Sequence, residues 1–597
     1  MSEDTARPPG TNSASPKDKN PAGDGFERNA ALRRLGEERF DVLVVGGGIT
    51  GAGVALDAAS RGLKTALVEK DDFASGTSSK SSKMIHGGIR YLQQREIRLV
   101  YENLAERQRL LNNAPHLVSP LPFLIPLFGR NGVVSKAVAR SYATALWLYD
   151  ITGGVRIGAR HRRVSKAEAL GHLPTLNADH LVAGFLYFDA RADDARLTLT
   201  ILRTAVLDHA AVAANYTPIV GFLTDDNGRV TGARVRPRIR PAVSGSFGEA
   251  AEGPDFDIHA TVVVNATGVW ADEVRALDEV GGPPSIRPAK GVHVTVPATK
   301  LPADIAAVIP VPKDKRSVFV VPWPEVDLVY IGTTDTSYTG TLENPVCTGE
   351  DVDYLLDAVN AVTTSALTRA DITGLWAGLR PLLAPPDDGR HLSERTADLS
   401  RRHSVRTSPE GVVTITGGKL TTYRKMAEDT LAQVVPMLGS RPAVGKCRTK
   451  GLALRGAPRR GSRPPAGSGV DPAVLSHLHA RYGTETAAVL AMAERPGLLE
   501  PIVTGLPYLG AEVVYAARAE MAQSVDDVLA RRTRALIQNA RSSAAAAAAV
   551  AELLAPELGW TAAQAAEQAA DFAARALAEL AEAGLGGPDT ADLGERA

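Results

Sequence analysis

Apolar and polar positions first fall into a regular pattern between residues 40 and 70. Residues 40–45 (FDVLVV) form a short, almost continuous apolar run, which is typical of a buried strand. A glycine turn and an amphipathic segment follow, and a second apolar run lies at 65–68 (TALV). Together these segments predict a β-α-β unit of about 30 residues.

Helix-like and strand-like segments then alternate as far as residue 436. The apolar run 121–128 (LPFLIPLF) is too short and too interrupted by proline to cross a bilayer, so it is either core or a surface that touches a membrane. Beyond residue 470 the sequence is alanine-rich, with a helical period and no strand signal. We expect helices at 96–112, 196–213 and 420–436, and strands at 181–188, 218–238, 261–265, 290–335 and 412–416.

Composition divides the chain into five parts. The first 37 residues are rich in Pro, Gly, Ser and charge, and residues 455–469 (RGAPRRGSRPPAGSG) resemble a linker. Because no glycine loop lies beyond residue 470, the helical region is expected to be separable from the chemistry of the body. We predict a disordered tail at 1–37, an α/β body at 38–450, a linker at 451–469, a helical domain at 470–585 and a second tail at 586–597.

Overall composition is that of an ordinary globular protein and excludes several classes. Of 597 residues, 44% are hydrophobic and 22% charged, which excludes a wholly disordered or collagen-like chain. The 67 basic and 67 acidic residues balance, so nothing suggests a nucleic-acid binder. The two cysteines, Cys347 and Cys447, allow neither a disulfide scaffold nor a CxxC metal or redox site, and they fit a reducing cytosol. No metal site is expected.

The glycine turn after the first strand has the pattern of a dinucleotide site. Gly46, Gly48 and Gly51 lie between a strand and a helix, where they allow a tight turn, close approach of a pyrophosphate and close helix–strand packing. Glu69 ends the second strand and can accept hydrogen bonds from a ribose diol, which favours FAD or NAD over NADP. The alternative is a glycine turn that serves packing alone.

A second feature favours FAD. The apolar run 261–265 continues into Ala266, Thr267 and Gly268, and this strand ending in Ala-Thr-Gly resembles the second nucleotide-facing strand of two-dinucleotide-domain flavoproteins. No second GxGxxG lies between a strand and a helix, so a separate nicotinamide domain is not expected. Electrons should therefore come from a substrate bound directly over the flavin.

Residues 74–92 (ASGTSSKSSKMIHGGIRYL) offer groups that suit a phosphate or a flavin ring. His86, Arg90 and Tyr91 bring an imidazole, a guanidinium and a phenol within six residues, and Gly87 and Gly88 allow the backbone to approach a planar ring. The residue pattern predicts that the cofactor is bound by Gly46, Gly48, Gly51, Glu69, Thr77, Ser78, Ser79, Lys83, His86, Gly87, Gly88, Thr267 and Gly268.

With these motifs the sequence resembles the FAD-dependent, aerobic-type glycerol-3-phosphate dehydrogenases over almost the whole chain after the tail. The resemblance rests on ordered motifs: His86–Tyr91, Asp193–Arg196, Asn265–Gly268, Lys290–His293, Phe319–Trp323, Ile331–Asp335, Ala377–Leu382, Ser400–His403, Gly417–Lys425, Ala519–Ala522 and Leu529–Arg534. It implies an α/β + α fold, in which a Rossmann-like FAD domain of the two-dinucleotide-binding type is interleaved with a β-rich substrate domain and followed by an all-α C-terminal domain.

The resemblance also implies an activity. Family members oxidise sn-glycerol 3-phosphate to dihydroxyacetone phosphate in glycerol catabolism, with hydride transfer from C2 to flavin N5 and electrons passed to a quinone. The alternative enzyme is a glycerol-3-phosphate oxidase that uses oxygen; an amino-acid oxidase and a non-catalytic redox sensor are further readings. We expect a cytoplasmic protein with peripheral contact to the inner face of the cell membrane, and a homodimer.

The resemblance implies the substrate residues as well. Arg90, Tyr91, Arg380, Arg401 and Lys419 would bind the phosphate dianion through charge-assisted hydrogen bonds, with Arg402 an equal alternative to Arg401. The predicted catalytic residues are His86, Arg380 and Lys419, and the resemblance adds Lys419, Leu420 and Thr421 to the predicted cofactor-binding residues. His86 is predicted to accept the hydroxyl proton, because an imidazole titrates near neutral pH. It could instead bind flavin or phosphate, with His293 and His403 as secondary bases or the cations lowering the alcohol pKa.

Overall fold

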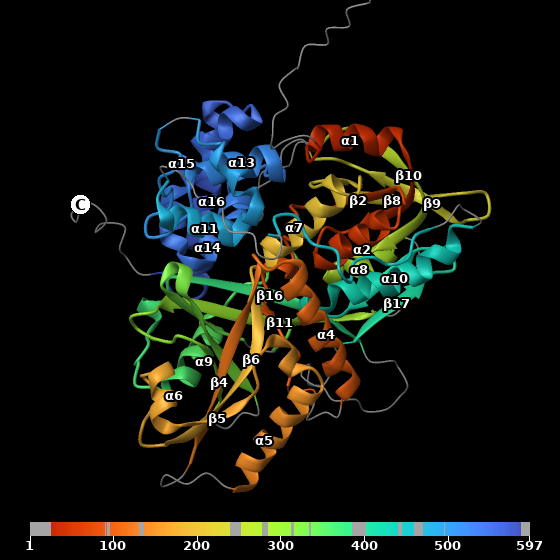
Figure 1. The fold of residues 1–597 in the computed structure, drawn as a ribbon. Helices are drawn as coiled ribbons and strands as arrows, with labels where there is room; N and C mark the ends of the chain where they lie inside the picture. Colours follow the sequence, from red (N-terminus) through yellow and green to blue (C-terminus); the bar gives the residue numbers. More distant parts are fainter. Residues whose placement is uncertain are drawn as a thin grey trace, which may run out of the picture.

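The computed structural model shows three parts: a Rossmann-like sheet with its helices, a second sheet, and a helical region (Figure 1). It describes residues 25–586 except 90, 92–95, 130–135, 239–251, 278–283, 312–315, 334–335, 385–401, 440–443, 459–469 and 495. Within these residues no helix is both long enough and apolar enough to cross a membrane.

The first sheet carries the glycine turn. Strand β1 (Arg39–Val45) runs parallel to β2 (Thr65–Val68) and β10 (Phe256–Asn265), and Val45 is in register with both Val68 and Asn265. The carboxyl ends of the three strands therefore meet at one edge, as expected for a doubly wound sheet. The sheet also contains β7 (Val212–Ala214), β8 (Ile219–Thr224), β9 (Val230–Val235), β17 (His403–Thr407) and β18 (Val413–Gly417).

Helices cover this sheet and bury its apolar strands. Helix α2 (Ile49–Ser60) packs between α7 (Asp194–Leu207) and α10 (Tyr423–Met437). Every α2 residue from Gly51 to Ser60 is buried, so its small side chains allow both neighbours to approach closely. Short helix α8 (Ala271–Arg275) follows β10.

The second sheet has ten strands and forms the lower part of the molecule in Figure 1. The apolar run at 121–128 lies in a long strand of this sheet, and Phe123 and Leu124 are buried, so this run belongs to the core. Its strands are β3 (Met84–Ile85), β4 (Val118–Phe128), β5 (Arg162–Ser165), β6 (Leu181–Ala192), β11 (Ile286–Pro297), β12 (Ala306–Pro310), β13 (Ser317–Trp323), β14 (Leu328–Gly332), β15 (Thr336–Ser337) and β16 (Gly374–Leu383).

Four further helices flank these strands. Two of them, α4 (Ile97–Asn113) and α5 (Lys136–Ile151), lie along one side of the second sheet, where α5 reaches the bottom of the molecule in Figure 1. Helices α6 (Lys166–His172) and α9 (Gly349–Asn360) lie on its other side, at the left in Figure 1.

The helical region packs firmly on both sheets. Its apolar side chains share one buried cluster with those of the second sheet, and Arg532 Nη1 lies 2.7 Å from Asp72 Oδ2 after β2. Arg534 pairs with Asp194 at 3.1 Å, and Arg196 with Glu520. Separability from the flavin chemistry stays a prediction, and these buried contacts argue against it. The region contains α11 (Pro472–Tyr482), α12 (Thr486–Leu490), α13 (Gly510–Glu520), α14 (Ala535–Gln538), α15 (Ala540–Leu558) and α16 (Ala562–Glu582).

The structure corrects the predicted N-terminal tail. Residues Arg28–Glu37 form helix α1, with Leu35 fully buried, so the tail prediction is wrong there, while residues 1–24 lie outside the described residues. The buried Arg28 guanidinium donates to the backbone carbonyls of Asn215, Tyr216 and Arg238. These partners come from remote parts of the chain, which is why local composition gave no sign of the helix.

Two other boundaries differ from the prediction. Helix α7 ends at Leu207, and strand β7 starts at Val212, so the predicted helix 196–213 is too long at its C-terminal end. Residues 451–458 are not a free linker, because Leu454 is buried and Arg455 pairs with Asp208 and Glu485. The remaining linker residues 459–469 and the tail 587–597 lie outside the described residues.

Candidate functional site

The glycine turn at the edge of the first sheet leaves room that side chains would fill. Gly46 has a φ of +108°, and a Cβ there would lie 2.7 Å from the Ala266 carbonyl oxygen. A Cβ at Gly51 would lie 1.8 Å from the Gly46 oxygen, so this glycine serves helix–strand packing. The Ile49 amide at the start of α2 donates to Ser78 Oγ at 2.8 Å. The positive end of α2 therefore faces the turn, as a pyrophosphate requires.

Glu69 lies at the end of β2, beside this turn. Its carboxylate accepts hydrogen bonds from the Gly47 amide at 2.6 Å and from the Asp71 amide at 2.9 Å. Burial, and to a lesser extent the nearby Asp71 carboxylate, raise the pKa of Glu69 to about 7. A donor diol would favour the ionised form and fits this carboxylate.

Both features open onto a first cavity of about 320 Å³. Apolar Ile219 and Leu277 lie at one part of its lining, and the α2 N-terminus and Glu69 lie at another. An elongated dinucleotide needs an apolar contact for its base, an acceptor for its ribose and amides for its phosphates. The predicted residues that line it are Gly46, Gly48, Glu69, Thr77, Ser78, Thr267 and Gly268.

A second cavity of about 150 Å³ adjoins the first, and Thr77 and Pro381 line both. Its walls come from the end of β3, from β11 and β16, and from the turn after β18. The predicted residues that line this cavity are Thr77, His86, Arg380, Lys419, Leu420 and Thr421.

Two of the cations that line this second cavity, Arg380 and Lys419, are among the predicted substrate residues. Arg380 Nη2 donates to Thr333 Oγ1 at 2.7 Å, and Nη1 donates to the Lys290 carbonyl at 3.3 Å. Gly291 makes room for the guanidinium, since a Cβ there would lie 2.4 Å from Arg380 Nη2. Lys419 Nζ lies 3.8 Å from the centroid of the Tyr91 ring. The two positive charges suit an anionic substrate.

Two histidines also line this cavity. The His86 backbone amide donates to Thr421 Oγ1 at 3.2 Å, which ties the end of β3 to the turn after β18. His293 stacks on Trp376 with ring centroids 4.6 Å apart, and its Nε2 lies 3.0 Å from Ser82 Oγ. Burial, with the Lys83 and Arg380 charges, holds the pKa of His293 well below its ordinary value, so the ring is neutral.

Several predicted residues lie elsewhere. Lys83 was predicted to bind the cofactor, but it lines neither cavity. Its ammonium is buried and pairs with Asp194 at 3.2 Å. Ser79 lines a separate cavity instead. Gly87 and Gly88 are needed for packing, because a Cβ would meet Tyr149 Oη at 2.5 Å and the Tyr91 ring at 2.3 Å respectively.

The remaining arginine and histidine candidates lie away from the two cavities or outside the described residues. Arg90 and Arg401 lie outside the described residues. The alternative to Arg401, Arg402, is an exposed residue that pairs with Glu96. His403 Nε2 lies 2.9 Å from Asp429 Oδ2, and His403 lines neither cavity. Sequence reasoning missed Thr333, Ser82 and Trp376, which hold Arg380 and His293; only the folded sheet brings them together.

Two family models match this chain. Residues 41–424 match the FAD dependent oxidoreductase family, and residues 447–565 match the C-terminal domain of alpha-glycerophosphate oxidase. The first match covers the first sheet, the second sheet and both cavities. The chain is therefore an FAD-dependent oxidoreductase, and the prediction that its cofactor is FAD is confirmed.

Named relatives align over nearly the whole chain. Glycerol-3-phosphate dehydrogenase 2 of Mycobacterium tuberculosis is 43% identical over 563 residues, which covers 93% of this chain and 91% of the relative. Glycerol-3-phosphate dehydrogenase of Mycobacterium leprae is 43% identical over 564 residues, with the same coverage. The crystal structure of glycerol-3-phosphate dehydrogenase from Bacillus halodurans complexed with FAD has a TM-score of 0.72 and 32% identity, covering 93% of this chain and 97% of that one.

Proposed function

The chain belongs to the family of FAD-dependent glycerol-3-phosphate dehydrogenases, and from this premise we propose that it oxidises sn-glycerol 3-phosphate to dihydroxyacetone phosphate and passes the electrons to a quinone. The observation that carries the proposal is the pair of adjoining cavities, one fitted to a dinucleotide and one holding Arg380, Lys419 and His86. When bound, FAD supplies the acceptor for the hydride that leaves C2.

Binding of the substrate falls to the cations of the second cavity. A phosphomonoester has few atoms to bury, so its affinity must come from charge-assisted hydrogen bonds. Arg380 is held in place by Thr333 and the Lys290 carbonyl, and it needs little reordering when the anion arrives. Lys419 lies over the Tyr91 ring at the same cavity. Arg90 and Arg401 remain proposed contributors from outside the described residues.

Removal of the hydroxyl proton is assigned to His86. It lines the second cavity and its backbone is fixed by Thr421. His293 is the competing base: it lines the same cavity and is neutral, but its low basicity makes it a weaker proton acceptor. Arg380 and Lys419 could also stabilise the alkoxide as it develops, and this effect would add to either base.

Anaerobic titration of the purified protein with glycerol 3-phosphate tests the substrate. One equivalent should bleach the flavin absorbance, and glycerol 1-phosphate of the opposite configuration at C2 should not. A flavin that neither compound bleaches would refute the proposal. Reoxidation then tests the acceptor: rapid reoxidation by a soluble quinone analogue with little peroxide supports the quinone. Stoichiometric peroxide in air would support the oxidase, whose name the C-terminal family match carries.

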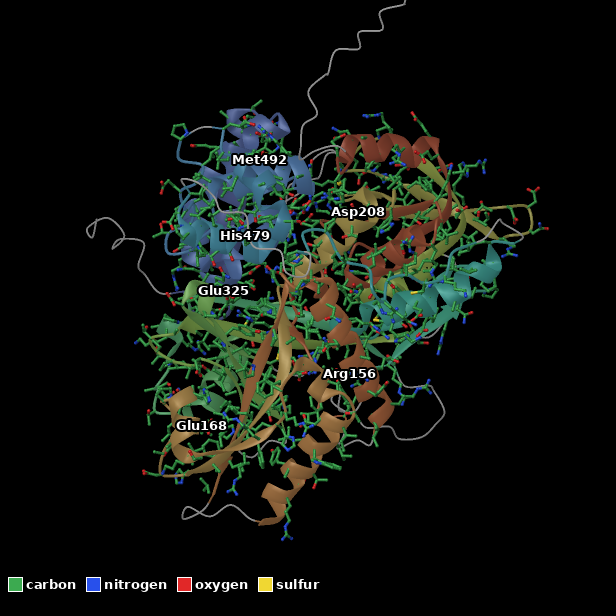
Figure 2. All side chains as sticks on the ribbon, viewed as in Figure 1. Arg156, Glu168, Asp208, Glu325, His479 and Met492 are labelled. Carbon is green, nitrogen blue, oxygen red and sulfur yellow. The ribbon has the colours of Figure 1, made fainter. Side chains whose placement is uncertain are left out.

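A surface of α4 and α5 supports contact with a membrane, where quinones reside. Tyr101, Trp147 and Ile151 are 52%, 60% and 60% exposed, which is unusual for such large apolar side chains. The Arg156 guanidinium lies 5.0 Å from the Tyr101 ring centroid and adds positive charge there (Figure 2). Trp147→Asp should reduce co-sedimentation with anionic lipid vesicles, whereas Leu577→Asp, at an exposed position of α16, should not.

A further inference from the structure

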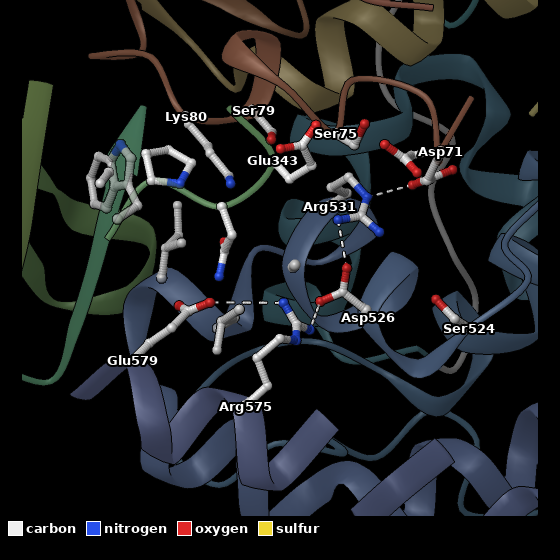
Figure 3. A pocket seen from close by; sticks show the side chains of 18 of the residues that line it. Asp71, Ser75, Ser79, Lys80, Glu343, Ser524, Asp526, Arg531, Arg575 and Glu579 are labelled. Atoms are coloured by element: carbon white, nitrogen blue, oxygen red, sulfur yellow. Dashed lines mark hydrogen bonds and ion pairs between the residues drawn. The ribbon is translucent and has the colours of Figure 1, made fainter. Parts of the chain in front are cut away.

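A third cavity of about 920 Å³ lies where the first sheet, the second sheet and the helical region meet (Figure 3). Leu375 and Ala377 of β16 and Leu536 of α14 give it an apolar wall. Charged side chains from the helical region give it an ionic wall. Its volume lies within the usual range of small-molecule sites, roughly 300–1,000 Å³.

Most charges around this cavity neutralise one another. Arg531 Nη1 lies 2.7 Å from Asp526 Oδ2, and Arg575 pairs with Asp526 and lies 3.8 Å from Glu579. Figure 3 shows these side chains as a continuous chain of ion pairs along one wall. Further pairs at this cavity are Lys70 with Glu343 at 3.6 Å, Arg238 with Asp71 at 2.9 Å, Arg531 with Asp72 at 2.5 Å and Arg534 with Asp194 at 3.1 Å.

Lys80 is the exception. Its side chain extends from the segment after Ser79 into the cavity, as Figure 3 shows, and its ammonium makes no hydrogen bond or ion pair with any residue that the structure describes. Burial is the largest influence on its charge and lowers the pKa of Lys80 to about 8. The charged groups that face it are Glu579, Arg575, Arg531 and Asp71, and they act on it in opposite directions.

We propose that this cavity binds an organic anion with one charged head group and an apolar body, whose head group pairs with Lys80. A half-buried ammonium that has no ion-pair partner among the described residues is destabilised, and an anionic ligand would supply that partner. Because the neighbouring charged side chains are already engaged in ion pairs, one negative head group on Lys80 would complete the pairing around the cavity. The apolar body would lie against Leu375, Ala377 and Leu536.

The proposed site is separate from the substrate cavity but adjacent to it. Lys80 also lines the second cavity, and a Cβ added at Gly378 of β16 would lie 2.4 Å from the Lys80 carbonyl oxygen. A ligand held by Lys80 would therefore contact the segment around Lys80, which lies between the third cavity and the second. The inference does not depend on which substrate the flavin oxidises, so the two proposals can fail separately.

Protection of Lys80 from acetylation tests the site directly. Three samples of the FAD-loaded protein would be treated with acetic anhydride: one without ligand, one with naphthalene-1-sulfonate and one with its uncharged counterpart 1-naphthol. Acetylation of each lysine would then be measured by mass spectrometry. Naphthalene-1-sulfonate should protect Lys80 saturably, 1-naphthol should protect it far less, and Lys300, which is exposed and remote in an ion pair with Asp371, should react equally in all samples. Equal acetylation of Lys80 in all three samples would overturn the proposal.

Equilibrium dialysis of naphthalene-1-sulfonate with variants isolates the charge. Lys80→Met should weaken binding by roughly 10- to 100-fold, the contribution of one charge-assisted hydrogen bond, while Lys80→Arg should retain most of the affinity. In the wild type the affinity should fall as the pH rises through about 8, because Lys80 then loses its proton, and this fall should be absent in Lys80→Arg. The wild-type pH profile decides the question even if a variant does not fold. An affinity that stays the same from pH 7 to pH 9 would refute the role of Lys80.

Discussion

The buried pair between Asp72 and Arg532 gives a sharp test of how the helical region is held. Asp72 is fully buried, and its carboxylate accepts from Arg532 Nη1 at 2.7 Å, Arg532 Nη2 at 2.9 Å and Arg531 Nε at 2.5 Å. The substitution Asp72→Asn keeps the volume of the side chain and removes its charge. It leaves two guanidinium groups in a buried site with one counter-charge fewer.

The expected cost follows from what each arginine keeps. Arg531 still has Asp526 at 2.7 Å and Asp527 at 2.6 Å. Arg532 keeps the Glu520 carbonyl at 2.8 Å and a Glu520 carboxylate oxygen at 3.7 Å. Removing one partner of a buried pair costs about 3–5 kcal/mol, and the remaining partners place this case at the lower end, about 3 kcal/mol. That corresponds to a change of about a hundredfold in the equilibrium for local opening.

Hydrogen exchange measures this opening at a well-placed amide. The Ala540 amide donates to the Thr373 carbonyl at 2.9 Å, across the boundary between the helical region and the second sheet. Its protection should fall about a hundredfold in Asp72→Asn at pH 7. The control is Asp208→Asn, which removes the partly exposed pair with Arg455 and should cost less than about 1 kcal/mol (Figure 2). Equal loss of protection in the two variants would refute the reasoning.

Acid provides a second check on the same pair. Although burial alone would raise it, Arg532 and Arg531 lower the pKa of Asp72 to about 2. The carboxylate therefore contributes its stability above the ordinary aspartate pKa, and the contribution is lost as the pH falls through about 2. Wild type and Asp72→Asn should converge in Ala540 exchange toward that pH.

Three further predictions concern the cavities. The pKa of Glu69 is raised to about 7, and a ribose diol would favour its ionised form. The affinity of the apoprotein for FAD should therefore rise with pH by up to about tenfold per pH unit below pH 7 and level off above it. Quenching of FAD fluorescence measures this affinity, and a pH dependence that persists in Glu69→Gln would contradict the assignment. His86→Gln should slow anaerobic flavin reduction by about 10²–10⁴-fold with FAD content retained. His403→Gln is the control, and a loss confined to His293→Gln would move the base to that residue. Arg380→Ala and Lys419→Ala should each lower kcat/KM by roughly 10- to 100-fold without loss of FAD, whereas Arg402→Ala on the surface should not; near wild-type efficiency in either removes that residue from the substrate site.

The sequence was informative where the chemistry is local in the chain. The turn from Gly46 to Gly51 and the acidic residue that ends the next strand are short-range features, so the β-α-β unit and a dinucleotide site could be predicted from spacing. The choice of FAD over NAD came from the strand that ends in Ala266, Thr267 and Gly268, which resembles a flavoprotein strand. The fold class was predicted from motifs spread over the whole chain, and the family matches confirm it. His86, Arg380 and Lys419 came from the resemblance, and the structure brings them to one cavity.

The errors have a common physical origin in long-range contacts. Lys83 lies in a segment that looks suited to phosphate, but its counter-ion Asp194 is 111 residues away in sequence. The segment around Leu454 looks like a linker by composition, yet Leu454 packs into the core of the first sheet. The cavity around Lys80 draws its walls from three parts of the chain, and no local pattern contains it.

Helix α1 has a practical consequence for anyone who shortens this protein. The regular apolar pattern begins at Phe40, which invites a truncated chain starting there. Such a chain would lose the Arg28 bonds to three carbonyls and the packing of Phe26 on Phe73, whose rings lie 6.0 Å apart just after the Glu69 turn. A chain that begins at Phe40 would thus lose the packing that supports the segment after Glu69, at the dinucleotide cavity. Preparations that begin at Phe40 should lose flavin during purification, whereas those that begin at or before Gly25 should keep it.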